Sequence, residues 1–249
     1  MKHVLSSHLQ KGLSLIELMV AMTLGLMIVS TLGYILMGSS STYRTQDASA
    51  RVQDTGRFAL EFIGRQIRAA GRVAITPLAC DTRVNMAGVD PVQTTSTSTS
   101  LSVQYQDTDM GRTLNTIPDC NGSAVTAGIQ TICGGPNHYV TVIDTISRDG
   151  QRQLQCNGNG GGSQPFAEGV EELQFRYTTG NGVWAATPTN PVAAVEVCIM
   201  VRSLNAGAVP TAQKLSNCAG VSTQYADTFL RRTFTSVFAV RNNISTLPN

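Results

Sequence analysis

Uncharged residues dominate the N-terminal part of the chain. Between residues 18 and 37 no side chain carries a formal charge. About 20 residues of α-helix span roughly 30 Å, which is the thickness of the hydrocarbon core of a bilayer. One carboxylate, Glu17, lies inside the apolar stretch that begins at Leu13. Because a carboxylate at the centre of a membrane costs about 2.5–3.5 kcal/mol on insertion scales, such a residue usually has a partner and a function.

An amphipathic pattern follows the uncharged run. Apolar and small residues recur at three- and four-residue steps, as on one face of a helix. They are Val52, Gly56, Ala59, Leu60, Ile63 and Ile67. We expect one helix over residues 13–70, with this stripe against a sheet and Gly71 as its C-cap. Gly25 and Gly33, in the uncharged half, are candidates for close packing against other helices, although simple tolerance of glycine in membrane helices also explains them.

The rest of the chain predicts strands. Period-two alternation or short apolar runs, bounded by turn residues, are typical of strands. The candidates are residues 101–105, 139–146, 154–156, 170–178, 192–203 and 230–242. The glycine-rich segment 157–163 predicts a loop, because it lacks the lysine of a phosphate-binding loop. The predicted fold class is therefore α+β, with a long N-terminal helix, membrane-spanning in its first half, packed on an antiparallel β-sheet head.

The first twelve residues differ from an ordinary secretory signal peptide. Lys2 and Lys11 supply positive charge, and a small residue, Gly12, precedes the apolar run. An ordinary signal peptide is cleaved after its apolar region, whereas a cut between Gly12 and Leu13 would lie before it. The positive-inside rule places this leader in the cytoplasm and the chain beyond the apolar run outside. An uncleaved anchor on a periplasmic domain is the alternative.

The formal charge of the chain, +2, comes from the leader. The sequence has 18 basic and 16 acidic residues, and removal of Lys2 and Lys11 leaves 16 of each. Broad binding to nucleic acid needs a basic surface, so a nucleic-acid partner is not expected.

Six cysteines all follow the apolar run. None forms a C-x-x-C pair, so the spacing of a zinc ribbon is absent. An even number of cysteines in an exported domain favours disulfides, for which six cysteines allow 15 pairings. The pairings that we favour are Cys198–Cys218 and Cys120–Cys156, which leave Cys80–Cys133. The alternative is that one or two of the thiols stay free and buried.

The sequence offers no recognisable catalytic set. His138 is the one histidine beyond the leader, and no serine or cysteine lies in a nucleophile motif. Residues 107–111 faintly resemble a calcium loop but lack its twelfth-position glutamate. Glu168, Glu171 and Glu172 form an acidic cluster that a solvated turn explains. We therefore expect no enzymatic activity, no metal and no cofactor.

The segment around the expected cleavage point matches a known motif. Residues 11–17, Lys-Gly-Leu-Ser-Leu-Ile-Glu, resemble the leader junction of type IV pilins and pseudopilins. The resemblance implies that a prepilin peptidase cuts after Gly12 and methylates the new amine of Leu13. It also implies that Glu17 is the assembly glutamate of that family. Most members have Phe at the first mature position. This chain has Leu13 there, which is a mild departure because leucine is also apolar.

Three further segments extend the resemblance across the chain. Residues 56–71, 169–177 and 231–242 resemble minor pilins of the PilW type. The implied organisation is a cleaved leader (1–12), a transmembrane and assembly helix (13–37), an amphipathic continuation (38–71) and a β-rich head (72–249). The implied location is the inner membrane of a Gram-negative bacterium, with the head in the periplasm, and later the extracellular pilus.

The resemblance also implies function and partners. A minor pilin would help to prime pilus assembly or form a tip complex, with other minor and major pilins and a tip adhesin as partners. Two alternatives stay open. One is a large-headed (GspJ-like) pseudopilin of a type II secretion system, which shares the anchor and Glu17. The other is a DNA-uptake or adhesion subunit that uses its head.

Overall fold

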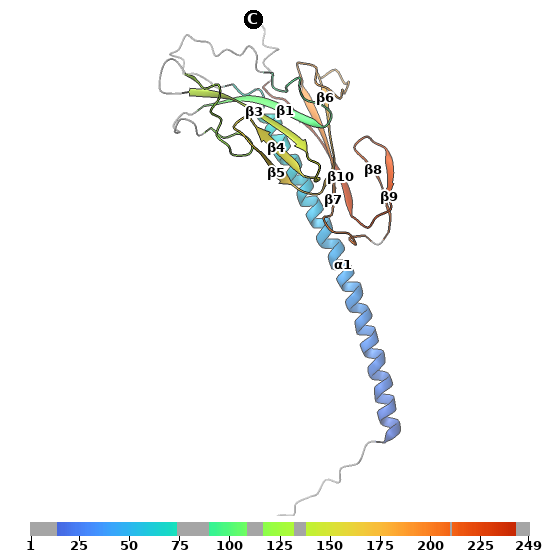
Figure 1. The fold of residues 1–249 in the computed structure, drawn as a ribbon. Coiled ribbons are helices and arrows are strands. Elements are labelled where there is room, and N and C mark those ends of the chain that lie inside the picture. Colours follow the sequence, from blue (N-terminus) through green and yellow to red (C-terminus); the bar gives the residue numbers. More distant parts are fainter. Residues whose placement is uncertain (1–13, 74–89, 109–116, 132–137, 210, 243–249) are drawn as a thin grey trace, which may run out of the picture. The chain divides into compact units, whose positions relative to one another are not determined.

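The computed structural model describes residues 14–73, 90–108, 117–131, 138–209 and 211–242 (Figure 1). Within these residues, one long helix, α1 (Leu15–Ala69), precedes ten strands. The chain divides into two compact units, Met1–Gln46 and Asp47–Asn249, which we describe separately.

The described part of the first unit is the N-terminal half of α1. Its side chains are exposed almost without exception, and a long window of them is apolar enough to cross a membrane. The expected start of the helix at Leu13 lies outside the described residues.

The C-terminal half of α1, two antiparallel sheets and a separate hairpin form the described part of the second unit (Figure 1). The first sheet has the order β1-β3-β4-β5, with β2 also paired to β3. Its strands are β1 (Ser100–Thr108), β2 (Gln130–Thr131), β3 (His138–Arg148), β4 (Leu154–Gly158) and β5 (Ser163–Ala167). The segment predicted as a glycine-rich loop is shorter than expected, because its first two residues end β4 and its last residue begins β5.

The second sheet has the order β10-β7-β6. Its strands are β6 (Val170–Thr178), β7 (Ala194–Arg202) and β10 (Arg231–Ala239), and the hairpin consists of β8 (Gln213–Ser216) and β9 (Ser222–Tyr225). The helix and antiparallel strands agree with the predicted fold class. The strands, however, form more than the single sheet that was expected.

The central strand β7 is buried on both faces, which explains its nearly continuous apolar sequence. Val197, Ile199 and their alternate neighbours belong to the main core. On the opposite face, Cys198 is bonded to Cys218, and the Tyr225 hydroxyl donates to the sulfur of Met200 at 3.6 Å. The β8–β9 hairpin therefore covers the outer face of this sheet.

The C-terminal half of α1 supplies one wall of the main core. Val52, Ala59, Ile63 and Ile67 are each at most 2% exposed and pack with inward-facing residues of both sheets. The amphipathic stripe predicted from the sequence lies against the sheets as expected. Gly71 follows the helix with a φ of 73°, as a glycine C-cap requires.

Strand β10 runs alongside this half of the helix. The guanidinium of Arg232 contacts the hydroxyl of Ser49, and at the far end the side-chain amide of Asn242 donates to the carbonyls of Arg68 and Ala70. Between these points, the rings of Phe234 and Phe238 lie directly over Gly56 and Gly64. The two glycines thus allow the strand to approach the helix.

We expect Gly64→Ala to lower the free energy of unfolding of the full chain by about 1 kcal/mol. The new methyl group would overlap the ring of Phe238. Such overpacking costs about 1–3 kcal/mol, and the better helix propensity of alanine returns up to about 1 kcal/mol. Urea denaturation in detergent micelles measures the change. Gly38→Ala is the matched control, because no atom lies within 4 Å of the added carbon there, and an equal loss in both variants would refute the explanation.

Candidate functional site

The predicted assembly residues lie at the start of the chain. Gly12 and Leu13 lie outside the described residues. Glu17 occupies the first turn of α1, where a negative charge is favourable beside the helix N-terminus. Its neighbours Ile16 and Leu18 are 67% and 50% exposed. Within the described part of the chain, the side-chain carboxylate of Glu17 has no ion-pair or hydrogen-bond partner.

Exposed apolar side chains, including large aliphatic ones, follow Glu17 along the first half of α1. Gly25 and Gly33 each have no atom within 4 Å of an added Cβ, so each leaves a small gap in this surface. Their role in packing against other helices stays a prediction. Exposed apolar surface on this scale is a site for lipid or for other protein chains.

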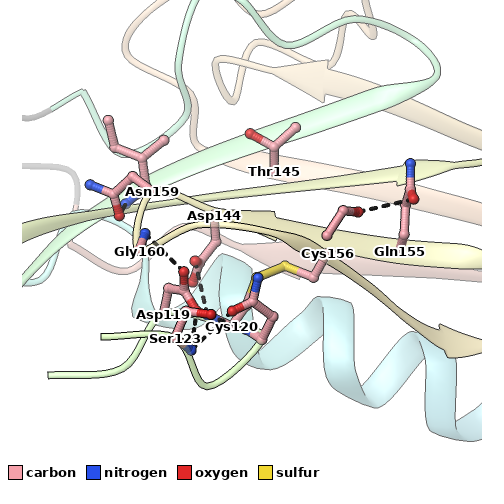
Figure 2. The surroundings of a disulfide bond; sticks show 12 residues. Asp119, Cys120, Ser123, Asp144, Thr145, Gln155, Cys156, Asn159 and Gly160 are labelled. Carbon is pink, nitrogen blue, oxygen red and sulfur yellow. Dashed lines mark hydrogen bonds between the residues drawn. A yellow bond between two sulfur atoms is a disulfide. The ribbon is translucent and has the colours of Figure 1, made fainter. Parts of the chain in front are cut away.

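Two disulfides connect described residues, Cys120–Cys156 and Cys198–Cys218. They are the two pairings favoured from the sequence. Cys80 and Cys133, the remaining pair, lie outside the described residues. Cys198–Cys218 ties the β8–β9 hairpin to β7. Cys120–Cys156 links the segment 117–131, which precedes β3, to β4 (Figure 2).

A carboxyl group lies against the Cys120–Cys156 disulfide. Asp144 is fully buried, at a position of β3 where the alternation of the strand places an inward side chain. One of its oxygens accepts the backbone N–H of Cys120, and the other accepts the Tyr105 hydroxyl, both at 3.0 Å. Burial raises the pKa of Asp144 to about 6, although these two bonds partly oppose the change.

Sequence reasoning missed Asp144. The available signal was an acidic residue at an inward position of the strand. Val140, Val142 and Ile146 occupy the other inward positions on the same face. Its oxygen and the two sulfurs all lie within 4.8 Å of one another. The sulfurs are bonded to each other, so this cluster does not offer a metal the two thiolates that it would need.

A second carboxylate, Asp119, holds the neighbouring turns together. It accepts the backbone N–H groups of Asn121, Ser123 and Gly160 at 2.9–3.1 Å (Figure 2). The third of these bonds joins the turn between β4 and β5 to the segment that carries Cys120. The oxygens of Asp119 are thus hydrogen-bonded to backbone N–H groups, whereas an oxygen of Asp144 lies near the sulfurs of Cys120 and Cys156.

The stability of the protein should depend on pH through Asp144. Its pKa in the folded chain, about 6, exceeds the ordinary 3.8, so the folded state holds the proton more tightly. This group therefore contributes stability at low pH that is lost as pH rises through about 6. The difference between the two pKa values corresponds to about 3 kcal/mol in the free energy of unfolding.

Asp144→Asn should remove this dependence. We expect the wild-type protein to lose more stability than the variant between pH 4 and pH 7, measured by urea denaturation at a series of pH values. Asp54→Asn, at an exposed position of α1, is the control and should follow the wild-type curve. Parallel curves for wild type and Asp144→Asn would contradict the assignment.

An ionic cluster joins the three strands of the second sheet. The guanidinium of Arg231, in β10, is 4% exposed and donates to both oxygens of Glu171, at 2.5 and 3.0 Å. It also donates to both oxygens of Asp227, at 2.5 and 2.7 Å. The hydrogen bond from Arg231 lowers the pKa of Asp227. Arg202, in β7, adds a third contact to Glu171 at 3.3 Å.

Aromatic rings complete this ionic cluster. The ring of Tyr225 lies 4.3 Å from the Arg231 guanidinium, and that of Phe229 lies 4.1 Å from Arg202. The interpretation of Glu171 as part of a solvated turn was therefore wrong. Its partner Arg231 is 60 residues away in the sequence, so local patterns carry no sign of the pair. The cluster is structural, since it fixes the ends of three strands.

Comparison with known proteins provides two family matches. The model of type IV pilus-assembly protein W matches residues 139–242, and the prokaryotic N-terminal methylation motif matches residues 7–33. No curated protein matches the chain significantly. Among solved structures, a type IV-like pilin from Thermus thermophilus aligns with a TM-score of 0.44 and 15% identity, over 77% of this chain and 96% of that chain.

Proposed function

We propose that this chain, a type IV pilin-like minor pilin of the PilW type, helps to prime pilus assembly or forms part of the tip complex. Its leader, residues 1–12, is removed by a prepilin peptidase, and the amine of Leu13 is then methylated. Residues 13–37 span the membrane and later pack in the pilus. Residues 38–71 continue the helix, and residues 72–249 form the head.

Glu17 is the observation that carries this proposal. It is the single carboxylate in the apolar N-terminal half of α1, within the segment that matches the methylation motif. In an apolar bundle of helices an unpaired carboxylate is costly, and the ammonium group at the N-terminus of a neighbouring pilin relieves that cost. A shifted register would leave both charges unpaired. The pair therefore selects the correct position of the subunit, in the way that buried polar groups set register in coiled coils.

The pilin-like character also suggests where the protein resides and what it contacts. We propose that the unassembled subunit lies in the inner membrane of a Gram-negative bacterium, with its head in the periplasm. During assembly the apolar surface exchanges lipid for the helices of other minor and major pilins. The head then contacts other tip subunits and a tip adhesin. Gly25 and Gly33 are the positions where a neighbouring helix approaches most closely.

A deletion strain tests the proposal. Loss of the gene should greatly reduce the amount of pili that can be sheared from cells and abolish twitching, while type II protein export continues. Plasmid-borne wild-type protein should restore the pili. Normal pili with failed protein export would instead identify a pseudopilin. Normal pili with lost DNA uptake or surface adhesion would identify a binding subunit of the pilus, and either result would overturn the proposal.

A further inference from the structure

We propose that Asp144 accepts the thiol proton of Cys156 when the Cys120–Cys156 disulfide closes. This inference is independent of the role of the protein in the pilus. It concerns the exported chain as its head folds and is oxidised.

The geometry of the fold brings the three groups together. Ile146 of β3 is the partner of Cys156 in β4, so Asp144 occupies the adjacent inward position of the same face. The Asp144 carboxyl oxygen and both sulfurs lie within 4.8 Å of one another. The bond from the Cys120 N–H to Asp144 holds the carboxyl group against the segment that carries the first cysteine.

The two cysteines differ in access to solvent. Cys156 is 2% exposed, whereas Cys120 is only partly buried. Cys120 is therefore the sulfur that meets an external oxidant, and Cys156 is the one that closes the bond. Thiol–disulfide exchange requires a thiolate, and an apolar environment raises the pKa of a buried thiol. Cys156 consequently needs a proton acceptor inside the fold.

The electrons and protons balance with a disulfide compound as the oxidant. The thiolate of Cys120 attacks one sulfur of that compound, forms a mixed disulfide and releases the first thiol. Cys156 then transfers its proton to the Asp144 carboxylate, and its thiolate attacks the Cys120 sulfur. The second thiol leaves and takes up a proton from solvent, and Asp144 returns the proton that it accepted to solvent. Two cysteine thiols have been oxidised, and one external disulfide has been reduced to two thiols.

Asp144 is better suited to this step than its acidic neighbour. The oxygens of Asp119 already accept three backbone N–H groups, and they are not among the atoms that lie within 4.8 Å of both sulfurs. Asp144 accepts two hydrogen bonds and is fully buried, and its pKa of about 6 leaves it ionised at neutral pH yet able to take a proton. A general base is most effective when its pKa lies near the working pH.

The test compares the two disulfides within one molecule. The full chain in detergent micelles is reduced in denaturant, refolded and oxidised with glutathione disulfide. Samples are trapped with an alkylating agent, and each cysteine-containing peptide is quantified by mass spectrometry. We expect Asp144→Asn to slow closure of Cys120–Cys156 by at least about tenfold at pH 7, since general bases contribute about 10²–10⁴-fold. Glu172 accepts the backbone N–H of Cys218 at 2.9 Å, but among the described residues only Asp144 has a carboxyl oxygen within 4.8 Å of both sulfurs of a disulfide. Closure of Cys198–Cys218 should therefore be unchanged.

The pH profile separates a proton acceptor from a merely structural residue. The wild-type closure rate of Cys120–Cys156 should fall as pH drops through about 6, and the rate for Cys198–Cys218 should show no step there. Tyr105→Phe keeps the carboxyl group but removes a hydrogen bond that lowers its pKa, so the step should move to higher pH. Equal slowing of both disulfides, no slowing of either, or an unshifted step in Tyr105→Phe would each overturn the proposal.

Discussion

Glu17→Ala should leave membrane insertion intact but reduce incorporation into pili by at least about 100-fold. The substitution removes a charge from an apolar helix, so insertion becomes easier. In the pilus, however, the ammonium group of the neighbouring subunit would lose its partner. Removal of one member of a buried ion pair costs about 3–5 kcal/mol, and each 1.4 kcal/mol changes an equilibrium constant tenfold. Immunoblots of sheared pili and of membranes measure the two quantities.

Glu61→Ala is the matched control for this substitution. It removes a carboxylate from the same helix, at an exposed position of its C-terminal half. Incorporation of this variant should equal that of the wild type. Normal pili in cells whose only copy carries Glu17→Ala would contradict the pairing role of Glu17.

Arg231→Ala should lower the free energy of unfolding by about 3–5 kcal/mol. The guanidinium is nearly inaccessible to solvent and satisfies Glu171 and Asp227 together. Among the described residues, its removal leaves the Glu171 carboxylate, which is 14% exposed, with only the more distant ion pair to Arg202. Breaking a buried ion pair from one side costs this much because the remaining charge stays uncompensated. Urea denaturation of the full chain at pH 7 measures the loss.

Arg232→Ala is the control for Arg231→Ala, because it removes an arginine from the adjacent, exposed position of β10. Substitutions of exposed residues usually change stability by no more than about 0.5 kcal/mol, and a result in that range is expected here. Replacement of Arg231 and Glu171 together by apolar residues should cost less than Arg231→Ala alone, because no charge is then left unpaired. Equal effects of Arg231→Ala and Arg232→Ala would show that the ionic cluster contributes little.

The elements with a strong local period were predictable from the sequence. Helix α1 and strands β3, β6, β7 and β10 follow from apolar residues at helical or alternating spacing. The arrangement of the strands in more than one sheet was not predictable, because it depends on pairing between distant segments. The burial of both faces of β7 is an example. Its apolar run indicated a central strand but not the hairpin that covers it.

The residues of the candidate sites also divide into those with a local signal in the sequence and those that depend on distant contacts. Glu17 stood out because a charge is unusual within an apolar run. The pairing of Cys120 with Cys156 was favoured from the sequence, but only the fold shows which carboxyl group lies beside that disulfide. Asp144 and Arg231 were overlooked for one shared reason. Their structural roles depend on contacts with Tyr105 and Glu171, which lie 39 and 60 residues away in the sequence. Local sequence patterns do not predict such distant contacts.

Determination of the N-terminus tests the central claim most directly. The protein should be purified from membranes and from sheared pili of cells that contain an active prepilin peptidase, and its intact mass and N-terminal peptide measured. We expect both preparations to begin at Leu13 and to carry one added methyl group on its amine. If the working protein keeps Met1 to Gly12, no free amine is available to pair with a neighbouring Glu17, and the assembly mechanism proposed for this chain is wrong.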